Sequence, residues 1–158
     1  MPEFDSKEPY VKQLMLYFQN GSYQKAFSLS KEFVKKFPKD TLSHFFLGRS
    51  AFWLNDFQTA KDESLKAFNL SEGEDEMAVA GILLACSYFQ LKEYQQGKEV
   101  LALLRTELPQ KEDIQKLRFV FSLALNDEAA AMRHLELLYT TNRKATSDFI
   151  VQFLERYA

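Results

Sequence analysis

Two histidines and one cysteine carry the most versatile chemistry in this sequence, and their spacing does not bring them into a site. His44 and His134 lie about 90 positions apart, without a cysteine or carboxylate at metal-ligand spacing. We expect His44 to be a packed side chain and not a ligand. Cys86 lies in an apolar segment with no flanking base, which favours an inert, buried or half-buried thiol over a nucleophile. The sequence thus predicts no metal, no cofactor and no catalytic residue, and hence no enzyme.

The charged clusters also have simpler interpretations than ligand sites. An acidic run (Glu72, Glu74, Asp75 and Glu76) could bind a cation, but its position favours charge placed at the N-terminus of a following helix. Five lysines between Lys25 and Lys39 are best explained as the solvated face of one helix, since no aromatic residues for stacking on bases alternate with them. With 20 basic and 22 acidic residues, the chain has no overall field that attracts nucleic acid.

Composition indicates one globular domain that covers residues 1–158. The chain is 46% hydrophobic and 27% charged, and its five glycines and four prolines are few for an all-β protein. No secretory signal is visible at the N-terminus. The longest apolar segment, Met77–Leu91, is shorter than the roughly 20 residues needed to cross a bilayer. We therefore expect a soluble protein without membrane insertion, cytoplasmic or, in a eukaryote, nuclear.

The apolar residues recur with a helical period along nearly the whole chain, and no segment alternates as a strand would. The fold class expected is all-α. Predicted helices cover approximately residues 6–20, 22–37, 41–54, 57–69, 77–91, 94–107, 112–125 and 128–141, with a last helix from Thr146 or Ser147. The segment Ser71–Glu76 is predicted to be a linker.

A second, longer period is superimposed on the helices. An aromatic residue followed by a small one appears as Tyr23…Ala26, Phe57…Ala60 and Tyr94…Gly97, with a degenerate copy at Glu128…Ala131. A helix-ending position follows each copy, at Pro38, Glu72, Pro109 and Arg143. Both series advance in steps of 34, 37 and 34, as from position 26 to 60, then to 97 and to 131. Such a period is typical of stacked repeats that bury their apolar faces against one another.

The repeat resembles the tetratricopeptide repeat family, whose unit is a helix–turn–helix of about 34 residues. The best copy, 41–74, carries His44-x2-Leu47-Gly48-x2-Ala51. The other copies are 7–40, 78–111 and a degenerate 112–145, and 146–158 would form a C-terminal capping helix. The resemblance implies a right-handed superhelix of three to four stacked antiparallel helix pairs.

In that family the first helix of each repeat lines a concave groove, and here the groove would be apolar. The resemblance assigns thirteen positions to a partner-binding surface: Val11, Met15, Phe18, Phe45, Phe46, Arg49, Phe52, Trp53, Val79, Ile82, Leu83, Cys86 and Phe89. Some relatives hold acidic C-terminal tails with cationic and amide groups, but the matching positions here, Val11, Met15, Phe46, Val79 and Leu83, have no side-chain donor. The function expected is a protein–protein interaction module or scaffold that binds an apolar helix or extended peptide.

Two alternatives use the same apolar surface. A second copy of the chain could cover it, as in a homodimer or a larger assembly in which this protein is a structural subunit. The side chains could also be packed by the molecule's own helices, because apolar stripes are more often core than site.

Overall fold

The protein is all-α in a computed structural model that describes residues 4–104, 111–144, 146–149 and 152. No strand occurs among these residues. Residues 143–144 and 146–149 are helical. Before them come eight helices: α1 (Lys7–Gln19), α2 (Tyr23–Lys36), α3 (Thr41–Trp53), α4 (Phe57–Leu70), α5 (Glu74–Gln90), α6 (Tyr94–Ala102), α7 (Lys111–Ala124) and α8 (Glu128–Thr141).

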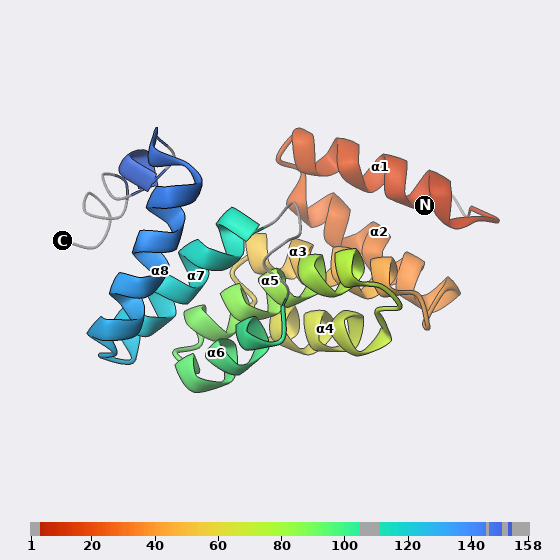
Figure 1. Ribbon diagram of the computed structural model, residues 1–158. Helices are drawn as coiled ribbons and strands as arrows, with labels where there is room; N and C mark the ends of the chain where they lie inside the picture. Colours follow the sequence, from red (N-terminus) through yellow and green to blue (C-terminus); the bar gives the residue numbers. More distant parts are fainter. Residues whose placement is uncertain (1–3, 105–110, 145, 150–151, 153–158) are drawn as a thin grey trace.

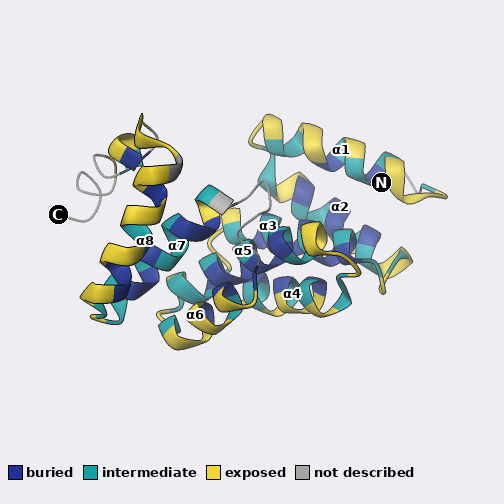
Figure 2. Cartoon of the chain, in the orientation of Figure 1, coloured by how far each residue is buried: buried dark blue, intermediate teal, exposed yellow. Residues whose placement is uncertain are grey.

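Each helix packs against the next one in the chain, and α1 and α8 lie at opposite ends of the resulting row (Figure 1). α5 additionally contacts α3 on one side and α7 on the other. The odd-numbered helices from α3 to α7 are therefore neighbours. Buried residues lie where helices face one another, and exposed residues lie on their outward sides (Figure 2).

Four turns within the row have the same backbone structure. Gly21, Asn55, Lys92 and Asn126 follow α1, α3, α5 and α7, and their φ angles are 69°, 63°, 60° and 59°. In each turn the next residue's N–H donates to a carbonyl five positions earlier, as from Asp56 to Ala51 at 2.9 Å. A residue in the left-handed conformation, together with this hydrogen bond across five positions, is the Schellman motif that ends many helices. From turn to turn the positions advance by 34, 37 and 34, so the period of the sequence is also a period of the backbone.

The extra residues of the longer step lie in a helix, not in the predicted linker. α5 begins at Glu74 instead of Met77, and only Ser71–Gly73 separates it from α4. Glu74, Asp75 and Glu76 occupy the first turn of α5, where the helix dipole favours negative charge. The Glu76 carboxylate also accepts the Glu72 N–H at 3.3 Å. These interactions stabilise a helical turn where the sequence predicts a loop.

Two other predicted boundaries differ from the structure or lie partly outside its described residues. α6 ends at Ala102, where Leu103 and Leu104 close a tight turn onto Val100 and Leu101, whereas the prediction extends the helix to Glu107. The end of that prediction lies in 105–110, outside the described residues. The predicted last helix lies largely outside them as well. Within its described part Thr146 is buried, and the Phe149 ring packs against Phe119 at 5.9 Å.

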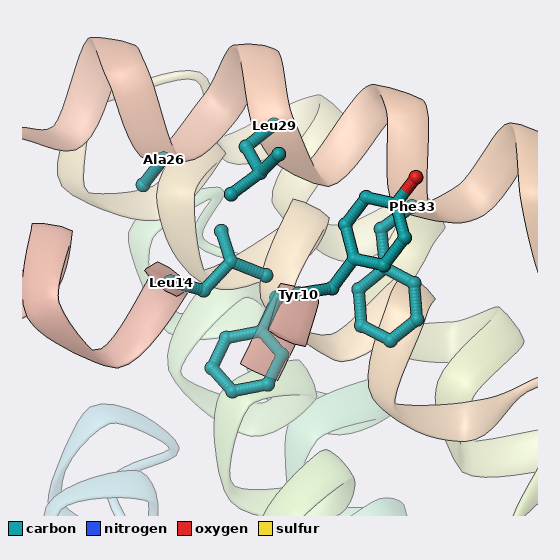
Figure 3. Packing of buried hydrophobic residues seen from close by; sticks show 6 residues of the cluster. Tyr10, Leu14, Ala26, Leu29 and Phe33 are labelled. Atoms are coloured by element: carbon teal, nitrogen blue, oxygen red, sulfur yellow. The ribbon is translucent and has the colours of Figure 1, made fainter. Parts of the chain in front are cut away.

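The core consists of two main clusters of apolar side chains. The first joins α1 to α2 and α3 and contains Tyr10, Leu14, Ala26, Leu29, Phe33 and Phe46. Its Tyr10 and Phe33 rings stack with centroids 4.9 Å apart (Figure 3). The second joins α5, α6 and α7 and contains Ala85, Leu101, Leu104, Ile114 and Phe121. Each cluster spans more than one hairpin, so neighbouring hairpins share their core.

Small residues mark the close crossings between helices. Ala26, Ala60, Gly97 and Ala131 occupy matching positions in α2, α4, α6 and α8, and all four are buried. A Cβ atom added to Gly97 would overlap the Phe121 ring of α7. A larger side chain at such a crossing would push the helices apart.

Candidate interaction groove

A groove lies between α3 and α5, with α3 along one wall and α5 along the other. It has a volume of about 300 Å³. Its lining is almost entirely apolar: Phe45, Arg49, Phe52 and Trp53 come from α3, and Val79, Ile82, Leu83 and Cys86 come from α5. Within each helix these side chains recur at the spacing of a helical turn, so each helix presents one continuous stripe.

A smaller hollow of about 180 Å³ extends this groove toward the beginnings of the same two helices. It shares Phe45 and Val79 with the larger part, and its outer end is lined by Asp75 and Glu76. From Thr41 to Trp53 the α3 wall is about 18 Å long, given a rise of about 1.5 Å per residue. The groove thus matches a short helical segment and ends beside two carboxylates.

The single tryptophan of the chain lies at the other end of the groove. Trp53 is 52% exposed, and its ring stacks on Tyr23 of α2 with centroids 5.3 Å apart. Phe52 contacts Trp53 edge to face, and Phe57 at the start of α4 packs against Phe52. The indole is therefore held in place by its neighbours while much of it stays in solvent. A fixed, exposed aromatic ring of this kind is typical of the residues that dominate binding energy.

Arg49 is the one charged side chain among the residues that line the larger part of the groove. Its guanidinium lies over the Phe18 ring of α1, 4.3 Å from the centroid. Burial lowers the pKa of Arg49 from its usual value, although arginine still remains protonated at neutral pH. The arginine is thus a fixed positive charge on an apolar wall, with its planar group oriented by an aromatic ring.

Cys86 lies half-buried in the α5 wall. Burial raises the pKa of its thiol to about 11, and the charge of Asp113 acts in the same direction. The thiol is therefore protonated at neutral pH and a weak nucleophile. Because Cys86 lines the groove, a partner bound there would cover its thiol, which makes the rate of thiol modification a measure of groove occupancy.

Eight of the thirteen residues assigned by the resemblance line the groove, and five lie elsewhere. Phe46 is buried in the first core cluster, and Phe89 packs with Tyr94 and Phe121 beside the second. Both therefore belong to the core. For these two residues the alternative holds that apolar side chains are packed by the molecule's own helices. On α1, Val11 and Phe18 pack against the first cluster and Met15 is 54% exposed.

The acidic end of the groove is not predicted from the sequence. The sequence predicts Asp75 and Glu76 in the approach to a helix, and it does not single out Thr41 or Ala80. The signal available is the acidic triplet before an apolar run, which is compatible with a helix that starts three residues earlier. That extra helical turn is what brings the carboxylates to the groove.

The two histidines belong to matching contacts in different helix pairs, but His44 comes from the first helix of its pair, α3, and His134 from the second, α8. The His44 Nδ1 lies 2.6 Å from Glu63 Oε2, and its Nε2 lies 2.6 Å from the Pro38 carbonyl oxygen. The predicted packed histidine is therefore also a buried ion-pair partner. His134 Nδ1 lies 3.2 Å from the Gln115 amide oxygen. In the described part of the chain, no three histidine, cysteine, aspartate or glutamate residues are grouped where they could hold a metal.

Comparison with known proteins adds no identification. No family model matches the sequence, and no curated protein matches it either. In the described residues, no helix combines the length and the apolar character required of a membrane span.

Proposed function

We propose that this protein is a helical-repeat scaffold of the tetratricopeptide type, and that the groove between α3 and α5 binds a segment of a partner protein. Two observations support the repeat type. The Schellman turns recur at steps of 34, 37 and 34 along the chain. The second helix of every pair has a small, buried residue at the matching position. In this architecture first helices lie side by side and create a concave surface, and α3 and α5 are such neighbours.

The observation that carries the binding proposal is the apolar groove with an exposed, fixed tryptophan. A surface of this kind loses water when an apolar partner covers it, and each buried methylene contributes about 0.8 kcal/mol. The partner segment is an amphipathic helix of about 12 residues, because the α3 wall is about 18 Å long. Its apolar stripe contacts Phe45, Phe52 and Ile82.

The charged residues of the groove favour one orientation of the partner segment over the opposite one. One end of the groove carries Asp75 and Glu76, and Arg49 lies farther along. A segment with lysine or arginine at the end above the two carboxylates, and a carboxylate near Arg49, complements both. Opposite placement of the charges puts like charges together and weakens binding.

The tryptophan provides the test. Two synthetic peptides, each long enough to form a helix that matches the α3 wall, share one leucine stripe and differ only in which end carries two lysines. Each peptide is titrated into the protein while Trp53 emission is recorded. We expect one peptide to shift the emission to shorter wavelength and to bind at least tenfold more tightly than its reverse, and to slow alkylation of Cys86.

Controls separate the groove from other surfaces. Ile82→Asp should abolish the emission shift with the far-UV helical signal intact, whereas Met132→Asp, which changes an exposed apolar residue on α8, should leave it unchanged. If neither peptide shifts the emission and sedimentation shows a dimer that Ile82→Asp dissociates, a second copy occupies the groove. Equal loss of binding in both variants also contradicts the proposal.

A further inference from the structure

A second hollow, of about 360 Å³, lies between α6, α7 and α8, away from the groove. Basic side chains from all three helices line it: Lys98 from α6, Arg118 from α7, and Arg133 and His134 from α8. No local sequence motif joins these positions, since the fold brings them together from separate helices. The volume is at the lower end of the range for small-molecule sites.

The charges of this hollow do not balance. Three of the side chains are lysine or arginine, and Asp127 is the one carboxylate among the residues that line it. Asp127 already accepts the Ala130 N–H at 3.1 Å as the N-cap of α8. In the described part of the chain, no carboxylate forms an ion pair with Lys98, Arg118 or Arg133. The hollow therefore has an excess of positive charge.

Arg118 is fixed in the wall of this hollow. One of its terminal nitrogens donates to the carbonyl oxygens of Leu101 and Leu104, at 2.6 and 2.9 Å, at the end of α6. A guanidinium has five N–H donors, and the other nitrogens of Arg118 form no hydrogen bond with the described residues, so they are available to a ligand. Because the group is held by the backbone, little side-chain entropy is lost when it binds an anion.

The positive charges of the hollow also affect the pKa of His134. Burial is the largest cause that lowers its pKa, and the charges of Arg118, Arg133 and Lys98 lower it further, while Asp127 acts in the opposite direction. Gln115 is its hydrogen-bond partner at 3.2 Å. The imidazole thus lies within the influence of every charged group that lines the hollow.

We propose that the hollow between α6, α7 and α8 binds a phosphate monoester, with Arg118, Arg133 and Lys98 around the phosphate and the exposed Ala102 against the organic part. Arginine forks pair with phosphate oxygens through two parallel hydrogen bonds, which makes them well suited to this group. The apolar wall and the volume of the hollow accommodate a substituent that inorganic phosphate lacks. The site does not depend on the groove between α3 and α5.

The two histidines make the test internally controlled. The C2 protons of His44 and His134 are followed by NMR while inorganic phosphate or phenyl phosphate is added, with phenol and sodium chloride of equal ionic strength as controls. We expect phosphate to raise the pKa of His134 and to leave His44 unchanged, and phenyl phosphate to bind more tightly than inorganic phosphate. Phenol alone should have no effect.

Variants and a peptide complete the experiment. Arg133→Gln and Lys98→Gln should each weaken phenyl phosphate binding about tenfold, and the exposed Lys35→Gln on α2 should bind as the parent does. A phosphotyrosine peptide that competes with phenyl phosphate would identify a phosphorylated protein as the source, and failure to compete would identify a small phosphorylated molecule. The proposal is overturned if His134 does not respond, if both histidines respond equally, or if Lys35→Gln weakens binding as much as Arg133→Gln.

Discussion

The helix pairs α3–α4 and α7–α8 have the same kind of turn, but a different polar contact joins the two helices of each pair. Their turns match, with Asn55 and Asn126 both in the left-handed conformation and 71 positions apart. The same offset relates His44 to Gln115 and Glu63 to His134. Each pair therefore joins its two helices through one polar contact at one place, but the histidine changes helix and its partner changes from a carboxylate to an amide.

The pKa values of the two histidines are shifted in opposite directions. Both partners of His44, a carboxylate and a carbonyl, are acceptors, and because only the protonated ring can donate from both nitrogens, they favour the positively charged form. The hydrogen bond to Glu63 is the main cause that raises the pKa of His44. Burial alone would raise the pKa of Glu63, but hydrogen bonds from His44 and Lys66 outweigh it and lower that pKa. His134 has one such partner and a lowered pKa. The same position thus supports either an ion pair or a neutral hydrogen bond.

A second difference concerns the distance of closest approach between helices. Gly48 in α3 faces the α4 backbone, and a Cβ there would lie 3.2 Å from the Ala60 carbonyl oxygen and the Ser64 nitrogen. The matching residue of α7 is Phe119, whose ring contacts Phe149. The absence of a side chain at Gly48 therefore lets α3 and α4 pack closely. At the matching position of α7, the Phe119 ring packs instead against a residue that follows α8.

The largest expected effect comes from Gly48→Leu, which puts a side chain at the tight crossing. Since the obstructing atoms belong to the backbone, they cannot move aside, and we expect a loss of about 3 kcal/mol in the free energy of unfolding. Urea denaturation measures it. Gly73→Leu is the matched control, because a Cβ at Gly73 meets nothing within 4 Å. Equal losses in the two variants would show that α3 and α4 are not closely packed at Gly48.

An intermediate effect separates the two histidine contacts. His44→Ala leaves Glu63 without its buried partner, and we expect a loss of about 2 kcal/mol, typical of a hydrogen bond between charged groups. His134→Ala removes a neutral hydrogen bond and should cost about 1 kcal/mol. Thermal and urea unfolding of the two variants at pH 6 test the ranking. A larger loss for His134→Ala would contradict the assignment of the ion pair to α3–α4.

Equal, smaller effects are expected at the two turns. Asn55→Ala and Asn126→Ala place a residue that avoids the left-handed region where asparagine tolerates it, and each should cost about 1 kcal/mol. Asn55→Gly and Asn126→Gly should restore the parent stability or exceed it. Chemical denaturation of the four variants sharpens the comparison, because the pairs differ in their polar contacts and agree in their turns. Unequal alanine effects would argue against equivalent turns.

The smallest expected effect is a change in how the free energy of unfolding varies with pH. In His134→Gln the one remaining histidine is His44, and since its folded pKa lies above 6.5, its stabilisation is complete below pH 6.5 and is lost as the pH rises through that raised value. In His44→Gln the opposite holds for His134, whose lowered pKa makes stability fall as the pH drops below 6.5. Unfolding free energies measured from about pH 5 to pH 8 should therefore slope in opposite directions. Parallel slopes would contradict both assignments.

Local patterns predicted the helices well, because capping, turn and apolar signals act over a few residues. The hairpin of Phe57–Leu70 with α3 follows from Asn55-Asp56 and its flanking stripes. The start of α5 is not predicted because Glu74, Asp75 and Glu76 resemble a polar linker, whereas the helix dipole stabilises their negative charges in the first turn of the helix. Eight of the residues that the resemblance assigns to a partner surface line the groove, whereas Phe46 and Phe89, which it also assigns, pack in the core, because neighbouring helices decide whether an aromatic ring is core or surface. The basic hollow had no signal in the sequence, because its charges come from three helices.

The repeated turn has a consequence for how the chain folds. Each Schellman turn is closed by a hydrogen bond between a residue and the fifth one before it, and each of these turns joins two helices that are adjacent in sequence. Little loop entropy has to be lost before a hairpin gains its first contacts, so the relative contact order of the fold is low and its folding is fast. Nucleation can begin in any hairpin and spread to its neighbours. Under force, the same chain would unravel from its ends, one hairpin at a time.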